Sequence, residues 1–209
     1  MLEQIPLWFY LITSIIYSSS AIIGFLVSYF AFKAYKMTKN KSHLFLSLSF
    51  LVISLGFVAL SSTSIYIYTI LQVYKTSAIS LNLLNYVGFR TYYILSSIGY
   101  VLLTLIYLPK KAINKLFILY VPIWYANSFN FHVFSIVLLL LVMVRSIVNS
   151  IKRKNLNSYL VTIAFICLLV FHSLLLLTAF SQSIYITANV FLIIGFLSLL
   201  LMLIRVNIK

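Results

Sequence analysis

The sequence is a succession of long apolar runs separated by short segments that carry lysine or arginine. The first run covers about residues 6–32 and the second about residues 44–74. An α-helix needs about 20 apolar residues to cross a bilayer, so both runs are long enough. Hydrophobic residues make up 64% of the 209 residues, more than one soluble core of this size can bury. The sequence therefore predicts an all-α, polytopic transmembrane helix bundle.

We expect one integral membrane domain, residues 1–209, with about seven spans. The expected spans are 6–32, 44–74, 89–108, 112–127, 129–151, 158–180 and 184–204. Residues 75–88 are more polar and are expected to lie outside as an interfacial segment. The first residues lack the charged region and cleavage site of a removable signal peptide, so we interpret them as the start of the first span. Residues 112–151 are ambiguous, because one span there would reduce the count to six.

The distribution of basic residues decides between these counts. Two spans, broken near residues 127–130, place 13 basic residues on one side and only Lys75 and Arg90 on the other. One span gives 7 against 8 and removes the positive-inside bias. We therefore predict a multi-pass protein of the cell membrane, with the N-terminus outside and the C-terminus in the cytoplasm. The predicted cytoplasmic basic face consists of Lys33, Lys36, Lys39, Lys41, Lys110, Lys111, Lys152, Arg153 and Lys154.

Acidic residues are almost absent: the sequence contains one, Glu3, and 15 lysines and arginines. Proton-coupled transporters, cation channels and pumps usually place carboxylates inside the membrane, so these classes are disfavoured. The basic loops are expected to bind anionic lipid headgroups of the bilayer or another polyanion. The single cysteine, Cys167, forms neither an intrachain disulfide nor a cysteine metal cluster. No enzyme motif occurs either, so we predict no catalysis, no metal site and no cofactor.

Small residues recur at helical spacing in the first two runs, and such stripes let helices pack closely. A hydroxyl-lined pore is the functional alternative. The stripes consist of Ser14, Ser18, Ala21, Gly24 and Ser28, and of Ser47, Ser54 and Ser61. The cluster Ser61, Ser62, Thr63 and Ser64 is hard to bury in lipid and forms a candidate functional position beside protein or water.

Of the histidines, His172 is expected deep in a span, His43 at a cytoplasmic helix start and His132 near an outer helix start. A membrane b-type haem needs two histidines at equal depth on facing helices. The three histidines are expected at three different depths, which favours a packing role for His172 over a role as haem ligand or proton relay. Retinal is disfavoured as well, because residues 184–204 contain no lysine.

Tyrosines gather toward the outer ends of the second and third spans, near Lys75 and Arg90. An aromatic belt at the lipid headgroups is the ordinary interpretation. A vestibule in which tyrosine rings stack on bases and Arg90 contacts phosphate is the alternative. The tyrosines are Tyr66, Tyr68, Tyr74, Tyr86, Tyr92 and Tyr93.

A weak internal repeat relates KNKSHLFLSLSF, from Lys39, to RKNLNSYLVTIAF, from Arg153. Pairing Ser42 with Ser158 puts two helix pairs in register. This suggests three helices, one linking helix and three further helices, with parallel repeats as in some small transporters. Chance similarity between two lysine-bounded helices is the alternative.

The composition, rich in Ile, Leu, Ser, Tyr and Lys, resembles that of small membrane proteins from AT-rich thermophilic archaea. In size, span count and basicity the chain resembles CedA, the polytopic membrane component of the crenarchaeal DNA-import (Ced) system. The resemblance includes no sequence motif, so it assigns no functional residue. It implies a subunit that acts with small membrane partners and a separate cytoplasmic ATPase to move DNA inward.

The first hypothesis is therefore a non-enzymatic channel or transport subunit for DNA import in a multi-subunit membrane complex. A seven-helix sensor or membrane anchor that docks a cytoplasmic signalling or respiratory partner is the second hypothesis. A b-type haem electron carrier is the third. The sequence leaves open whether copies of the chain associate.

Overall fold

The computed structural model of the protein describes residues 7–74, 78–107, 128–178 and 182–208. Within these ranges the chain forms α-helices joined by short turns, which confirms the all-α class. The helices are α1 Leu7–Thr38, α2 Lys41–Tyr74, α3 Ala78–Leu105, α5 Ser128–Arg153, α6 Leu156–Leu176 and α7 Gln182–Ile208. The predicted span 112–127 lies outside the described residues, as do Lys110 and Lys111.

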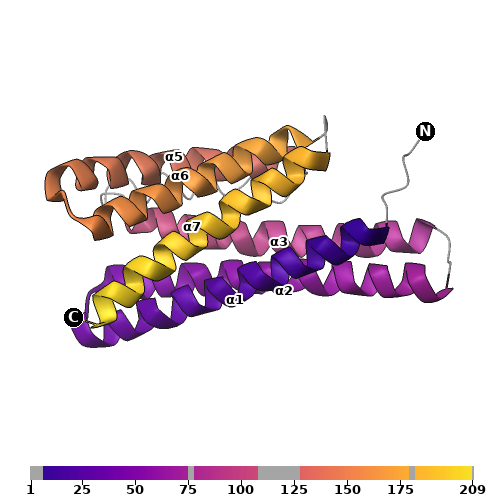
Figure 1. Ribbon diagram of the computed structural model, residues 1–209, viewed down its shortest axis with the longest axis horizontal. Coiled ribbons are helices and arrows are strands. Elements are labelled where there is room, and N and C mark those ends of the chain that lie inside the picture. Colours follow the sequence, from indigo (N-terminus) through magenta and orange to yellow (C-terminus); the bar gives the residue numbers. More distant parts are fainter. Residues whose placement is uncertain (1–6, 75–77, 108–127, 179–181, 209) are drawn as a thin grey trace.

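The helices close into a ring. Each packs against the next one along the chain, α3 packs against α5, and α7 packs against α1. In Figure 1, α7 runs diagonally from the α6 side of the bundle toward α1 and α2. The α1–α2 turn, the α5–α6 turn and the end of α7 lie at one end, which we call the basic end because it carries Lys39 and Lys154 (Figure 1).

Five of the described helices, α1, α2, α5, α6 and α7, are long and apolar enough to cross a membrane. The chain is therefore a multi-pass membrane protein. Helix α3 has 28 residues and is not among these five. Its polar side chains Tyr92, Tyr93, Ser96 and Ser97 are buried, so they face the other helices.

Several helix ends differ from the expected spans. Helix α3 begins at Ala78, so residues 78–88, expected in an outer interfacial segment, continue into the third span as one helix. Helix α5 begins at Ser128, inside the expected break. Helix α6 ends at Leu176, one turn before the expected end at residue 180.

Both turns at the basic end have the same construction. Lys39 and Lys154 take a left-handed backbone, with φ of 56° and 46°, and each donates its N–H to the carbonyl four residues earlier. A left-handed residue at this position ends a helix, and the positive side chain suits the helix C-terminus. The asparagine that follows starts the next helix: the Oδ1 of Asn155 accepts the Ser158 N–H at 2.8 Å, and that of Asn40 accepts the Ser42 N–H at 3.0 Å.

The two halves of the chain also pack in the same pattern. If α1, α2 and α3 correspond to α5, α6 and α7, then the contact of α1 with α7 corresponds to that of α5 with α3. Any closed ring of six helices gives this correspondence, so the repeat stays a prediction. The turns, however, pair Lys39 with Lys154, one residue away from the register that pairs Ser42 with Ser158.

The small-residue stripes form the interface between α1 and α2. Ser61 Oγ lies 3.1 Å from the Ser14 carbonyl oxygen and 2.6 Å from Ser18 Oγ. Nearer the basic end, Ser28 Oγ donates to the Ser47 carbonyl oxygen at 2.9 Å. A Cβ atom on Gly24 would meet Ser54 Oγ at 2.2 Å. Ser18, Ser28, Ser47 and Ser61 thus take part in hydrogen bonds across the interface, as the packing interpretation predicts.

Candidate functional site: two polar cavities in the helix ring

The described residues enclose two cavities with polar groups in their lining, both inside the ring. One opens toward the end opposite the basic end, and we call it the tyrosine-end cavity. The other is the basic-end cavity. Between them the core is packed with side chains such as Phe57, Phe165 and Phe196, all fully buried. On α7 the cavities are marked by Tyr185 and Met202, about 25 Å apart along a helix axis.

The tyrosine-end cavity has a volume of about 200 Å³ and takes residues from five helices, α1, α3, α5, α6 and α7. Its polar lining consists of Tyr17, Tyr92, Tyr93, Ser128, His132, Thr178 and Tyr185. The hydroxyl groups of Tyr17 and Tyr185 form a hydrogen bond across the α1–α7 contact. Aromatic side chains with polar tips give such a cavity both apolar walls and hydrogen-bonding groups, as small-molecule sites have.

One hydroxyl group in this cavity has no hydrogen-bond partner among the residues that the structure describes. Tyr92 is 3% exposed and lines the cavity, yet its Oη has no hydrogen-bond partner among the described residues. A buried hydroxyl group without a partner costs about 1–3 kcal/mol. A ligand or water in the cavity would satisfy it.

A chain of hydrogen bonds leads from this cavity into the core. His132 Nδ1 on α5 lies 2.9 Å from His172 Nδ1 on α6, and His172 Nε2 lies 2.8 Å from Tyr100 Oη on α3. All three residues are buried. Phe131 and Phe171 pack their rings against His172. The chain thus ties three helices together at one level of the bundle.

The chemistry of imidazole allows the hydrogen bonds between His132, His172 and Tyr100 to run in two directions. A neutral histidine has one N–H donor and one nitrogen acceptor. If His172 Nδ1 donates to His132, its Nε2 accepts the Tyr100 hydroxyl proton; if Nε2 donates to Tyr100, Nδ1 accepts from His132. Both arrangements keep every group neutral, so the hydrogen bonds can run in either direction without burying a charge.

The prediction that the histidines lie at three different depths is wrong for His132 and His172. His132 lies one turn after the start of α5, and His172 lies one turn before the end of α6. Because α6 ends at Leu176 and not at residue 180, both imidazoles lie at the same level on facing helices. His43, by contrast, lines the basic-end cavity.

This pair also has a consequence for the haem hypothesis. Two axial imidazoles would hold their nitrogens about 4 Å apart, twice a metal–imidazole bond of about 2.0 Å, with a macrocycle between the rings. The facing nitrogens of His132 and His172 are 2.9 Å apart and bonded to each other. A haem would require these helices to separate, so the arrangement fits a hydrogen-bonded pair better than an axial ligand pair.

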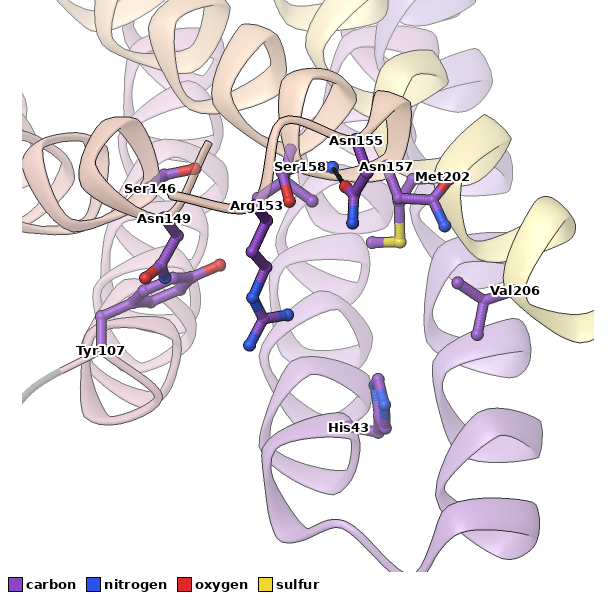
Figure 2. A pocket seen from close by; sticks show the side chains of 11 residues that line it. His43, Tyr107, Ser146, Asn149, Arg153, Asn155, Asn157, Ser158, Met202 and Val206 are labelled. Carbon is purple, nitrogen blue, oxygen red and sulfur yellow. Dashed lines mark hydrogen bonds between the residues drawn. The ribbon is translucent and has the colours of Figure 1, made fainter. Parts of the chain in front are cut away.

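The basic-end cavity has a volume of about 260 Å³ and lies between α2, α3, α5, α6 and α7. Figure 2 shows the Arg153 side chain extending into the space between Tyr107 and His43. Other lining residues are Ser146, Asn149, Asn155, Asn157, Ser158, Val161, Met202 and Val206. Asn157 Oδ1 is buried and has no hydrogen-bond partner among the described residues.

The structure does not bring the other predicted site residues together. Ser61 points to α1, Ser62 is exposed, and Ser64 is buried. Thr63 packs closely against Gly88 of α3: a Cβ atom added to Gly88 would lie 2.3 Å from Thr63 Oγ1. Of the candidate polar positions, only His172 belongs to the cavity network.

Arg90 and the tyrosines divide between two locations. Arg90 is exposed, with its guanidinium group 4.4 Å from the centre of the exposed Tyr86 ring. Tyr66 is exposed on the bundle surface, as an aromatic belt requires. Tyr92 and Tyr93 instead point into the ring and line the tyrosine-end cavity. The described residues of the predicted basic face are all exposed, and Arg153 alone among them lines a cavity.

Sequence reasoning missed Tyr17 and Tyr185 as a hydrogen-bonded pair, and Tyr100 and His132 as the partners of His172. One available signal was the short distance of each histidine from a polar helix break. His132 follows the break near residue 128, and His172 precedes the polar residues from Thr178 to Ser183. Comparison of the chain with known protein families, curated proteins and solved structures finds no match.

Proposed function

We propose that this chain is a non-enzymatic transport subunit that holds its cargo, or part of it, in cavities accessible from opposite sides of a membrane. One observation carries the proposal: a cavity with polar groups in its lining occupies each end of the same ring interior, and tightly packed aromatic side chains separate the two. Transporters that expose a site to each side in turn need this combination of a polar interior and a closed barrier.

The seven-span topology with a cytoplasmic basic end is part of this proposal. Tyr107, just after α3, lines the basic-end cavity, whereas Ser128, the first residue of α5, lines the tyrosine-end cavity. Helix α3 thus ends and α5 begins at opposite ends of the bundle, as a crossing between them requires. Lysine and arginine at the basic end follow the positive-inside rule and favour the cell membrane orientation predicted from sequence.

DNA import is the specific cargo hypothesis. The basic end would attract a polyanion entering the cell. Cavities of about 200 and 260 Å³ hold a small ligand and not a nucleic-acid strand. DNA would therefore pass along an interface with further small membrane subunits or further copies of this chain, driven by a separate cytoplasmic ATPase. The ring would serve as a gate or support.

The experiment has two arms. In the first arm, liposomes that contain the protein should show solute flux. A charged residue in place of Phe196 or Phe57, which lie in the barrier, should abolish this flux, because it prevents the barrier from closing or the protein from folding. Because that variant can fail to fold, the second arm deletes the gene and measures DNA transfer between cells. Reduced transfer supports the DNA cargo; flux with unchanged transfer supports a small solute. The absence of both solute flux and a DNA-transfer defect would contradict the transport proposal.

A sensor or anchor that docks a cytoplasmic partner is the second candidate. It is favoured by the exposed lysines and arginine at the two turns of the basic end, which offer a positive surface to an acidic protein. Co-purification of a kinase or redox enzyme, and not of an ATPase, would favour it. Absorbance of the purified protein near the haem Soret band would favour the b-type haem carrier.

A further inference from the structure

The basic-end cavity combines features that single out a class of ligand. We propose that it binds a phosphate ester, with Arg153 as the principal charged contact. The phosphate can belong to a phospholipid headgroup or to a small soluble ester, and the chemistry of recognition is the same. The inference does not depend on the transport proposal.

Hydrogen-bond donors surround the cavity. Arg153 projects into it in Figure 2, and the amide side chains of Asn149, Asn155 and Asn157 line it together with His43. The guanidinium group offers five N–H donors in a fork that matches phosphate oxygens. A phosphate monoester presents three strong acceptor oxygens, so it can use several of these donors at once.

No carboxylate among the described residues balances the charge of this cavity. The only acidic residue of the chain is Glu3, which lies outside the described residues, so no described carboxylate can pair with Arg153. A phosphate from the bilayer or the solution would supply the counter-charge. Basic pockets between transmembrane helices at the cytoplasmic side are known to take phospholipid headgroups.

The remaining walls fit the ester part of such a ligand. Val161, Met202 and Val206 form an apolar side, and the unpaired Asn157 Oδ1 can accept a hydroxyl proton. Ligand pockets usually have volumes of about 300–1,000 Å³, so about 260 Å³ suits a glycerol phosphate group better than a nucleotide.

The test uses the full chain and two probes. The first is sn-glycerol 3-phosphate, added to the detergent-solubilised protein. The second is phosphatidic acid, incorporated into phosphatidylcholine nanodiscs. Thermal-unfolding midpoint and binding affinity are measured for the wild type, Arg153→Gln and Lys152→Gln. Lys152 is the matched control, because it is an exposed neighbour of equal charge that does not line the cavity.

We expect at least one probe to raise the unfolding midpoint of the wild type. Arg153→Gln should weaken binding about tenfold or more, the loss typical of one charged hydrogen-bonding group, and Lys152→Gln should leave it unchanged. Stabilisation by phosphatidic acid alone identifies a lipid headgroup as the source, and stabilisation by glycerol phosphate identifies a soluble ester. If Arg153→Gln does not fold, Arg153→Lys, which keeps the charge but loses the fork, should weaken binding severalfold. Equal losses in both glutamine variants, or no response to either probe, would overturn the proposal.

Discussion

The interface between α1 and α2 and the ring interior beside α3 both bury hydroxyl groups, but they use them differently. In the first, small serines bond directly across the interface, as in the contact of Ser61 Oγ with Ser18 Oγ at 2.6 Å. In the second, large aromatic residues and histidines surround a cavity, and Tyr92 Oη lacks a partner among the described residues. Polar side chains that satisfy one another stabilise packing, whereas unsatisfied ones beside a cavity indicate a binding site.

The largest effect should come from filling a close helix contact. A Cβ on Gly99 of α3 would lie 2.4 Å from Ile53 Cγ1 and 2.9 Å from the Ser49 carbonyl oxygen. Because the backbone must shift, Gly99→Ala should reduce the free energy of unfolding by about 2–3 kcal/mol. Gly195→Ala is the control, since its nearest contact, the Ala164 carbonyl oxygen, is at 3.1 Å. Unfolding in mixed micelles measures both, and equal losses would contradict the assignment of the tight contact.

Removal of the central imidazole should have the next largest effect. His172→Leu leaves His132 Nδ1 and Tyr100 Oη without their described partner, at a cost of about 2 kcal/mol in unfolding free energy. The double variant with His132→Leu should lose less than the sum of the single variants, because the two side chains share one hydrogen bond. His43→Leu, at the other cavity, is the control. Additive losses would show that the imidazoles do not interact.

The serine interface should respond weakly. Ser61→Ala removes a hydrogen bond across α1 and α2, and such bonds inside membranes contribute about 0.6 kcal/mol on average. Ser62→Ala is the matched control, because Ser62 is exposed. A loss from Ser61→Ala as large as that from His172→Leu would break the distinction between the two regions.

Removal of the Tyr92 hydroxyl group should have the smallest effect on the free energy of unfolding. Tyr92→Phe removes a hydroxyl group that has no described partner, and water in the cavity offsets most of the cost of burying that group, so the free energy of unfolding should change by less than about 0.5 kcal/mol or rise slightly. Tyr100→Phe removes the hydroxyl group bonded to His172 and should cost about 1 kcal/mol. The same unfolding assay compares them, and a reversed order would show that Tyr92 is the residue with the structural bond.

The sequence predicted the all-α class because apolar runs of this length have few alternatives. It also placed the small-residue stripes correctly, since helical spacing alone aligns Gly24 with the serines. It did not find the contact of His132 with His172, because no glycine or proline marks the end of α6 at Leu176. Nor does composition distinguish Tyr66, exposed on the surface, from Tyr92, which faces the cavity. That difference depends on which face of each helix meets its neighbours.

Cysteine labelling tests most directly whether the two cavities open to opposite sides of the membrane, as proposed. In a Cys167→Ser background, Ser128→Cys places a thiol at the tyrosine-end cavity, Asn149→Cys at the basic-end cavity and Leu192→Cys in the packed core. Right-side-out and inverted vesicles are treated with a membrane-impermeant thiol reagent. We predict labelling at position 128 only from outside, at position 149 only from the cytoplasmic side, and none at 192 from either side. Labelling of positions 128 and 149 from the same side would contradict the account.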